Sequence, residues 1–175
     1  MPKAESFIDF QTEGFDELSK RFEGSREFVR GALNRALRRM GKTLVPEVKK
    51  ETPRGATNKL ANTTIFQVIG KGEDMTMEIR QSAFSEKGFS YGAAVRTGTR
   101  PHFPPSNALI PWVQKKLGID AVMAPRIAFL VARKISRVGT VEDPYHERAF
   151  ESKVGDLHAI YDEEMEKLAE RLIKE

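Results

Sequence analysis

Apolar residues recur every three or four positions between residues 25 and 48, which is the spacing of one face of an amphipathic helix. The stripe consists of Val29, Leu33, Ala36, Leu37, Met40, Leu44 and Val48. A short opening helix is expected over 15–22, followed by a break and a cap at Gly24–Ser25. Pro46 lacks the amide hydrogen that a helix interior requires, so a kink or a break is predicted near Gly41 and Pro46.

Alternation of polar and apolar residues replaces the helical period in the next part of the chain. Residues 51–63 are polar and rich in turn formers, which indicates a loop. Residues 64–70 and 75–81 alternate in polarity around a charged turn, and the pair therefore predicts a β-hairpin. Residues 91–98 form a third strand-like piece, weakened by its glycine and alanines.

Two further helices are predicted by prolines that suit the first helical position. Pro111 introduces a helix over 111–118 and Pro125 introduces one over 125–139. The second has an apolar side and is expected to be the central core helix. Its apolar positions are Ile127, Leu130, Val131, Ile135 and Val138, with Phe129 widening the surface. Trp112 and Phe129 are interpreted as core residues because each falls on an apolar stripe.

A final helix is predicted from Pro144 towards residue 174, with Asp143 as its cap and Gly155 as an interruption. The order of elements predicts an α+β fold: a small antiparallel sheet packed against several α-helices, with a long N-terminal helix and a C-terminal helix. A chain of 175 residues fits a single domain, 1–175, in which residues 1–24 are a flexible N-terminal extension.

Composition limits the chemistry. The chain contains no cysteine, so disulfides, thiolate metal sites and cysteine nucleophiles are excluded. The three histidines lack metal-binding spacing, and no phosphate-binding, dinucleotide-binding or serine-hydrolase motif occurs. No apolar run suffices to cross a bilayer, and the first residues lack the apolar segment of a signal peptide. We therefore expect no catalytic residue, no cofactor, no metal and no membrane contact, and a protein that is not an enzyme.

The loop "GTRPHFPP" is the strongest candidate for a functional site. It places His102 near Arg96 and Arg100, an arrangement suited to an anion. A single histidine without a positioned carboxylate specifies no reaction, however. The three prolines of the loop fix backbone angles. The loop is thus interpreted as a rigid connector, and Arg100, His102 and Phe103 are candidate contacts to another protein subunit.

Charge is unevenly distributed, although the net charge is only +4. The segment Lys20–Arg54 carries about +7 and the segment Glu142–Glu175 about −6. The basic segment includes Arg35, Arg38 and Arg39, which fit either a contact between copies or a phosphate-binding face. Because the segment lacks interleaved aromatic residues and a recognised reading motif, a solvated face or a subunit contact is favoured.

An ordered series of segments in the central block carries a family resemblance. The segments are "YGAAVRTGT", "RPHFPP", "ALIPWVQKKLG", "AFLVARKISRVGT" and "PYHERAFE". In this order they resemble the putative tail-component family of long-tailed bacteriophages, which is grouped with minor tail, neck and tail-completion proteins. The resemblance covers about residues 25–155. The upstream "TPRGATNKLANT" is similar to the loop before the family's first strand, but Asn58 stands where glycine is usual, which puts that turn in question.

The resemblance implies a structural virion protein that acts in tail completion or head–tail joining. It implies self-assembly, as a ring, and contacts with tail-tube or neck proteins, in the tail or head–tail junction after assembly in the host cytoplasm. The oppositely charged segments would supply matching patches on neighbouring copies. The alternative is a basic nucleic-acid-binding module that contacts DNA non-specifically.

Overall fold

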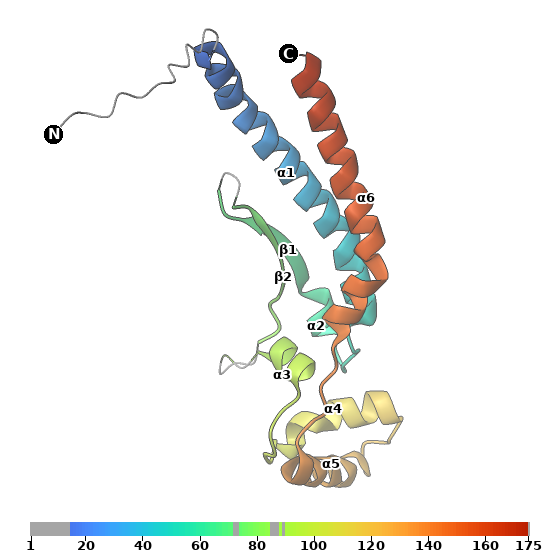
Figure 1. Ribbon diagram of the computed structural model, residues 1–175. Coiled ribbons are helices and arrows are strands. Elements are labelled where there is room, and N and C mark those ends of the chain that lie inside the picture. The colour runs from blue at the N-terminus through green and yellow to red at the C-terminus, as the bar shows by residue number, and fades with distance from the viewer. Residues whose placement is uncertain (1–14, 72–73, 85–87, 89, 175) are drawn as a thin grey trace, which may run out of the picture.

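The computed structural model describes residues 15–71, 74–84, 88 and 90–174, with the backbone alone for 15–23. Its elements in order are α1 (Phe15–Glu51), α2 (Lys59–Asn62), β1 (Thr64–Ile69), β2 (Thr76–Gln81), α3 (Tyr91–Thr97), α4 (Ser106–Leu117), α5 (Ala124–Val138) and α6 (Tyr145–Lys174). The long helices α1 and α6 lie side by side and antiparallel, the β-hairpin lies along α1, and α4 with α5 forms a lobe at the far end (Figure 1). The predicted α+β fold, with its small antiparallel sheet and long terminal helices, is confirmed.

Helix α1 is continuous over 37 residues, so the predicted break at Gly24–Ser25 is wrong, and the helix is not broken at Gly41 or Pro46 either. Pro46 is exposed, and the residues on either side of it that face the core, Leu44 and Val48, are 5% and 1% exposed. Packing on both sides of the proline keeps the helix intact, although Pro46 has no amide hydrogen to donate to the preceding turn. The helix begins within the predicted flexible extension, of which residues 1–14 lie outside the described residues.

The contact between α1 and α6 forms the main core. Its buried α1 residues belong to the predicted apolar stripe or adjoin it, and they include small side chains that let the helices approach closely. The buried set is Ala32, Ala36, Leu44 and Val48 from α1 with Tyr145, Ala149 and Leu157 from α6. At the other end of the pair, the guanidinium of Arg171 lies 3.9 Å from the ring centroid of Phe28.

Helix α6 begins at Tyr145, one residue after the predicted start at Pro144. Asp143 forms an ion pair with Arg148, 2.7 Å between Oδ1 and Nη1, across the first turn. The predicted interruption at Gly155 is wrong, because the helix continues to Lys174. Gly155 lies on the exposed side, where the cost of a glycine is small compared with the packing of the opposite face.

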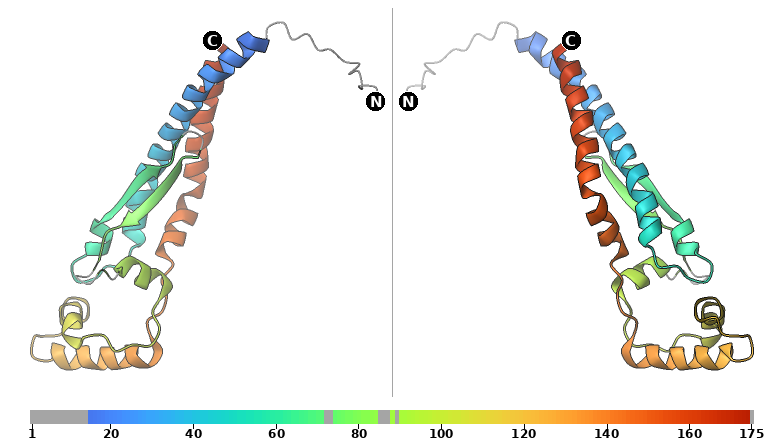
Figure 2. Two further views of the ribbon diagram at one scale, coloured as in Figure 1. Left: turned by 90° about the vertical axis from the view of Figure 1, so that its left-hand side faces the viewer. Right: turned by 90° about the vertical axis from the view of Figure 1, so that its right-hand side faces the viewer.

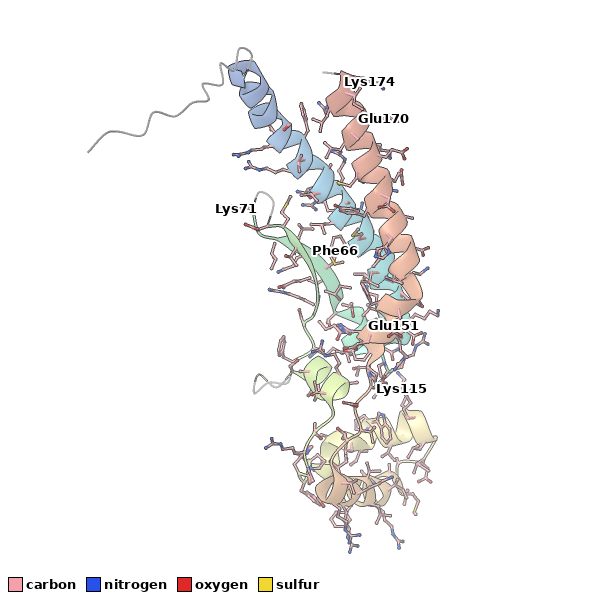
Figure 3. All side chains as sticks on the ribbon, in the orientation of Figure 1. Phe66, Lys71, Lys115, Glu151, Glu170 and Lys174 are labelled. Carbon is pink, nitrogen blue, oxygen red and sulfur yellow. The ribbon has the colours of Figure 1, made fainter. Side chains whose placement is uncertain are left out.

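The predicted hairpin is confirmed, with β1 and β2 antiparallel and in register from Thr64↔Gln81 to Ile69↔Thr76. Its contact with α1 depends on Gly41. A Cβ at that position would lie 2.3 Å from the ring of Phe66, which occupies the space between the hairpin and the helix (Figure 3). The glycine therefore creates the depression in α1 into which the sheet packs.

Buried polar groups tie the hairpin to the beginning of α6. The Tyr145 hydroxyl donates a hydrogen bond to Oε1 of Gln81. Nε2 of Gln81 donates to Oγ1 of Thr64 at 3.0 Å, and this hydroxyl donates to the carbonyl of Leu60 at 3.1 Å. Burial raises the pKa of Tyr145 and lowers the pKa of neighbouring His146. The satisfied network fixes the relative positions of α2, the sheet and α6.

The third strand predicted over 91–98 is wrong, because this segment is helix α3. The side-chain oxygen of Ser90 accepts a hydrogen bond from the amide of Ala93, 3.3 Å away, and so caps the helix. A Cβ on buried Gly92 would lie 2.9 Å from Oε1 of Gln81, so the glycine allows α3 to approach the polar network. Tertiary contact, rather than the weak strand pattern, decides this element.

The loop 51–63 contains the four-residue helix α2, preceded by Asn58. Asn58 has φ 52°, in the left-handed region that glycine adopts most readily and asparagine tolerates better than most residues. The backbone of this turn therefore differs little from that of a turn with glycine at the same position. Across the described residues, no helix is both long and apolar enough to span a membrane.

Helix α4 begins at Ser106, five residues before the predicted start, and includes Pro111. Leu109 and Ile110 precede the proline and pack on the small core around Val113, which extends the helix backwards. Helix α5 begins with Pro125 in its first turn, as predicted. It is not the central core helix, however, because it packs against α4 in the lobe.

We predict that Gly41→Ala lowers the free energy of unfolding by about 1–3 kcal/mol, because the Phe66 ring must leave its place on α1. Chemical denaturation followed by circular dichroism measures this change. Gly155→Ala is the matched control: nothing lies within 4 Å of the added methyl, so the helix should gain about 0.5–1 kcal/mol. Equal stabilisation by both substitutions would contradict the packing role of Gly41.

Candidate protein-interaction surface

The six residues expected at a protein interface lie in two separate places. Arg35, Arg38 and Arg39 belong to α1, whereas Arg100, His102 and Phe103 belong to the connection between α3 and α4. The first group lies beside α6 and the second adjoins the α4–α5 lobe. The structure therefore does not combine them into one surface.

Two of the α1 arginines hold a carboxylate of α6. Nε of Arg35 donates to Oε2 of Glu164 at 2.9 Å, and Nη1 of Arg39 donates to Oε1 of the same residue at 2.7 Å. The Glu164 side chain is only 5% exposed. Arg39 also donates through Nη2 to Oε2 of Glu163, at 2.6 Å. We call this group of two arginines and two glutamates the arginine–glutamate cluster.

Hydrogen bonds within this cluster lower the carboxylate pKa values. The bonds from Arg39 and then Arg35 hold the pKa of Glu164 below its ordinary value. The bonds from Arg39 and Lys167 lower the pKa of exposed Glu163 to about 2. The charge-assisted bonds stabilise the ionised form of each carboxyl group.

The cluster corrects the interpretation of the charge asymmetry. The basic and acidic segments meet within one chain along α1 and α6, so Arg35 and Arg39 are already committed to internal ion pairs. Arg38 is exposed and donates through Nε to Oδ1 of Asn34 at 2.6 Å. Two of the three arginines are thus engaged within the chain, and Arg38 alone of the three forms no ion pair with another described residue.

A narrow neck joins the lobe to the rest of the chain (Figure 2). Thr99 and Thr140 exchange backbone hydrogen bonds of 3.2 and 3.1 Å, and their hydroxyls lie 2.9 Å apart. Gly98 and Gly139 precede them with φ of 69° and 74°. A Cβ on Gly139 would lie 1.9 Å from the carbonyl oxygen of Thr99, so the two chain segments cross at a distance that only glycine permits.

Beyond the neck, the loop residues expected at an interface are exposed. Nδ1 of His102 lies 2.9 Å from the carbonyl oxygen of Arg100, a local contact that orients the ring. Phe103 is 54% exposed and its ring centroid lies 5.9 Å from that of Phe129. The interpretation of Phe129 as a core residue is wrong, since it is 50% exposed, whereas Trp112 does pack on the lobe's core.

The outer face of α5 is both apolar and basic. Ala124, Ala128 and Ala132 are fully buried, the first two in the core shared with Val113 of α4, whereas Leu130 is 49% and Val138 68% exposed. The buried side predicted for α5 is therefore wrong at Leu130 and Val138, because the small residues, not the large ones, face the neighbouring helix. Around these apolar residues lie the exposed cations Arg126, Arg133, Lys134 and Arg137.

The lobe also carries a marked excess of positive charge, which sequence reasoning missed. Residues 98–141 contain seven Lys and Arg against a single acid, Asp120. The signal lay in the spacing of Arg126, Leu130, Arg133 and Arg137, which recur at steps of four, three and four on one helical face. It was hidden because the same helix also carried an apolar pattern that predicted burial.

Other surfaces of the described chain offer less defined chemistry. An open groove of about 810 Å³ lies between α1 and the hairpin, lined by Arg26, Glu27, Arg30, Gly31, Asn34, Lys71 and Met75. Among the described residues, no group of three histidine or acidic side chains is placed to hold a metal ion. The exposed lobe is thus the surface with the clearest capacity for binding, through apolar contact and charge.

We predict that acid destabilises the helix pair through the arginine–glutamate cluster. Folding lowers the pKa of both glutamates, so the folded state binds fewer protons than the unfolded chain and stability falls as the pH drops from about 4.5 towards about 2. Glu163→Gln/Glu164→Gln should flatten this dependence in urea titrations at several pH values. Glu166→Gln, which alters an exposed glutamate of the same helix, should retain the wild-type slope. The same slope in all three proteins would refute the assignment.

We predict that Gly139→Ala lowers the stability by at least about 1 kcal/mol more than Gly118→Ala. Both glycines have positive φ, 74° and 65°, so both substitutions strain the backbone. Of the two, Gly139 alone faces another chain segment at close range, because its Cβ would lie 1.9 Å from the carbonyl oxygen of Thr99, whereas nothing lies within 4 Å of a Cβ on Gly118. Thermal unfolding of the two variants measures the difference, and equal losses would mean that the close crossing at the neck contributes nothing.

Comparison with known proteins adds nothing to the description of the lobe. No family model, no curated protein and no solved structure matches the chain. Its interpretation therefore depends on the burial, charge and spacing of the side chains described above.

Proposed function

We propose that the chain is a structural assembly protein of a tailed bacteriophage, which acts in tail completion or head–tail joining by binding neighbouring protein subunits through the α4–α5 lobe. The observation that carries the proposal is the half-exposed apolar surface of the lobe, formed by Phe103, Phe129 and Leu130 beside arginines. Contiguous exposed apolar surface marks interaction sites, and aromatic residues and arginine are enriched in protein interfaces.

The shape of the chain supports this role. The paired helices α1 and α6 form a long stalk, with the lobe at one end and the described chain ends at the other (Figures 1 and 2). The neck restricts the contact between these parts, and Nζ of Lys115 donates to the carbonyl of Ala56 at 2.6 Å to brace the lobe. An extended protein with a braced binding lobe suits contact with several neighbours in an assembly.

The segments that resemble the bacteriophage tail-component family correspond to α3, the neck, the lobe and the beginning of α6. Their two Gly-Thr pairs, 98–99 and 139–140, are the residues that cross at the neck. The resemblance thus falls on the part of the chain that positions the proposed binding surface, which favours the tail or head–tail junction as its place of action.

A nucleic-acid-binding role is the second candidate, favoured by the net positive charge of the lobe. Non-specific DNA binding requires cations and gains little from exposed aliphatic side chains. Leu130 and Val138 lie among the cations of α5, so the surface fits a protein partner better.

We predict that the protein is present in purified virions produced from a genome that carries its gene, as measured by mass spectrometry. The variant Arg100→Ala/His102→Ala/Phe103→Ala should fold with unchanged helicity, because all three residues are exposed, yet yield few infectious particles and many unjoined heads and tails in electron micrographs. Lys49→Ala/Lys50→Ala, on the exposed side of α1, is the control and should give normal particles. Absence from virions, or normal particles from the triple variant, would contradict the proposal.

A further inference from the structure

One face of α5 presents cations and a leucine that the described chain leaves without a partner. Arg126, Leu130, Arg133 and Arg137 lie on the side opposite the buried alanines, and all four are exposed. In the part of the chain that the structure describes, none of the three arginines forms an ion pair. A hollow of about 450 Å³ follows this face, lined by Leu130, Arg133, Lys134, Arg137 and Val138. We call this surface the basic face.

The outward side of α6 presents the opposite charge. Glu151, Asp162 and Glu166 are exposed and lie away from the buried side that holds Leu157. Among the described residues, these three carboxylates have no cationic partner, in contrast to Glu163 and Glu164. Between them lie Gly155 and Ala159, both exposed and small. We call this surface the acidic face.

We propose that the basic face of one copy binds the acidic face of a second copy of the chain. This inference rests on the proposed assembly function and names the contact that would join its subunits. The two faces match in spacing, because Arg133 and Arg137 are four residues apart, as are Asp162 and Glu166. With the two helices in the same direction and Arg133 opposite Asp162, Leu130 falls opposite Ala159 and Arg126 opposite Gly155.

This register combines charge pairing with apolar packing. Paired positions four residues apart lie about 6 Å apart along each helix, so two ion pairs form side by side. The small residues of the acidic face leave room for the Leu130 side chain, which is 49% exposed in the single chain. Burial of Leu130 beside these two arginine–carboxylate pairs combines an apolar contact with charged pairs at its edge, as in protein interfaces.

The contact must form between copies and not within one. Helix α5 lies across the lower end of the molecule, beyond the neck, whereas α6 runs away from the lobe from its first turn (Figures 1 and 2). Glu151 is already on the stalk, above the lobe that carries Lys115 (Figure 3). Because the two faces differ and lie on separate parts of one chain, each copy can bind one neighbour with α5 and another with α6. Such head-to-tail contacts produce closed rings or open chains.

A pair of charge-reversal variants tests the contact in the full chain by sedimentation velocity at low salt over a range of protein concentrations. The wild type should associate, and rising salt should weaken the association. Arg133→Glu/Arg137→Glu and Asp162→Lys/Glu166→Lys should each sediment as monomers where the wild type associates. An equimolar mixture should regain association, because the first variant keeps the acidic face and the second keeps the basic face.

Lys49→Glu/Arg54→Glu is the matched control, since it changes the net charge as much as the α5 variant does, at exposed positions outside both faces. This variant should associate like the wild type. Circular dichroism and thermal unfolding establish that each variant is folded. A charge-swapped chain with all four reversals should also associate, because both faces are then inverted together.

Several results would contradict the proposed contact between the two faces. A wild type that is monomeric at every concentration and salt would do so, as would variants that associate normally or a mixture that stays monomeric. Loss of salt-sensitive duplex DNA binding in the α5 variant, with self-association unchanged, would assign the basic face to nucleic acid instead. The virion experiment is independent of these outcomes: a protein required in particles but monomeric in solution would retain the assembly function and lose this contact.

Discussion

Glu164 joins the C-terminal helix α6 to the N-terminal helix α1, and most of the structure depends on the ion pairs that it forms there. Its side chain is 5% exposed and lies between Arg35 and Arg39, which are more than 120 residues away in the sequence. An ionised carboxylate is stable in such a place only if cationic donors satisfy it. The arginines therefore fix the register of α1 against α6, and that register aligns the alanines and leucines of the main core.

The same cluster determines which charges are left for binding. Once the α1 arginines are paired with α6, the net excess of positive charge lies in the α4–α5 lobe, where seven cations face a single acid. The neck then holds this lobe apart from the stalk, because Gly98 and Gly139 bring the two connecting segments into contact. A basic and apolar lobe at the end of a long helical stalk is suited to contact with acidic protein surfaces, including the outward side of α6.

Local sequence patterns predicted the elements whose period was unambiguous. The stripe on α1, the hairpin at 64–81 and the start of α5 at Pro125 follow from spacing and turn chemistry, which act over a few residues. The pattern misled at 91–98, where Gly92 serves contact with Gln81, and at Pro46, where packing holds the helix intact. It also misled on α5, because the buried side of that helix uses alanine, and a stripe of large apolar residues usually indicates burial.

The candidate surface was predictable only in part. The sequence by itself determined an α+β chain of long amphipathic helices around one hairpin, and it selected the loop at Arg100, His102 and Phe103, which is exposed. Only the tertiary structure decided that Arg35 and Arg39 are internal partners of Glu164, while Arg133 and Arg137 form no ion pair with any other described residue. The physical reason is that helical periodicity is a property of neighbouring residues, whereas the pairing of a charge depends on which distant segment packs against it.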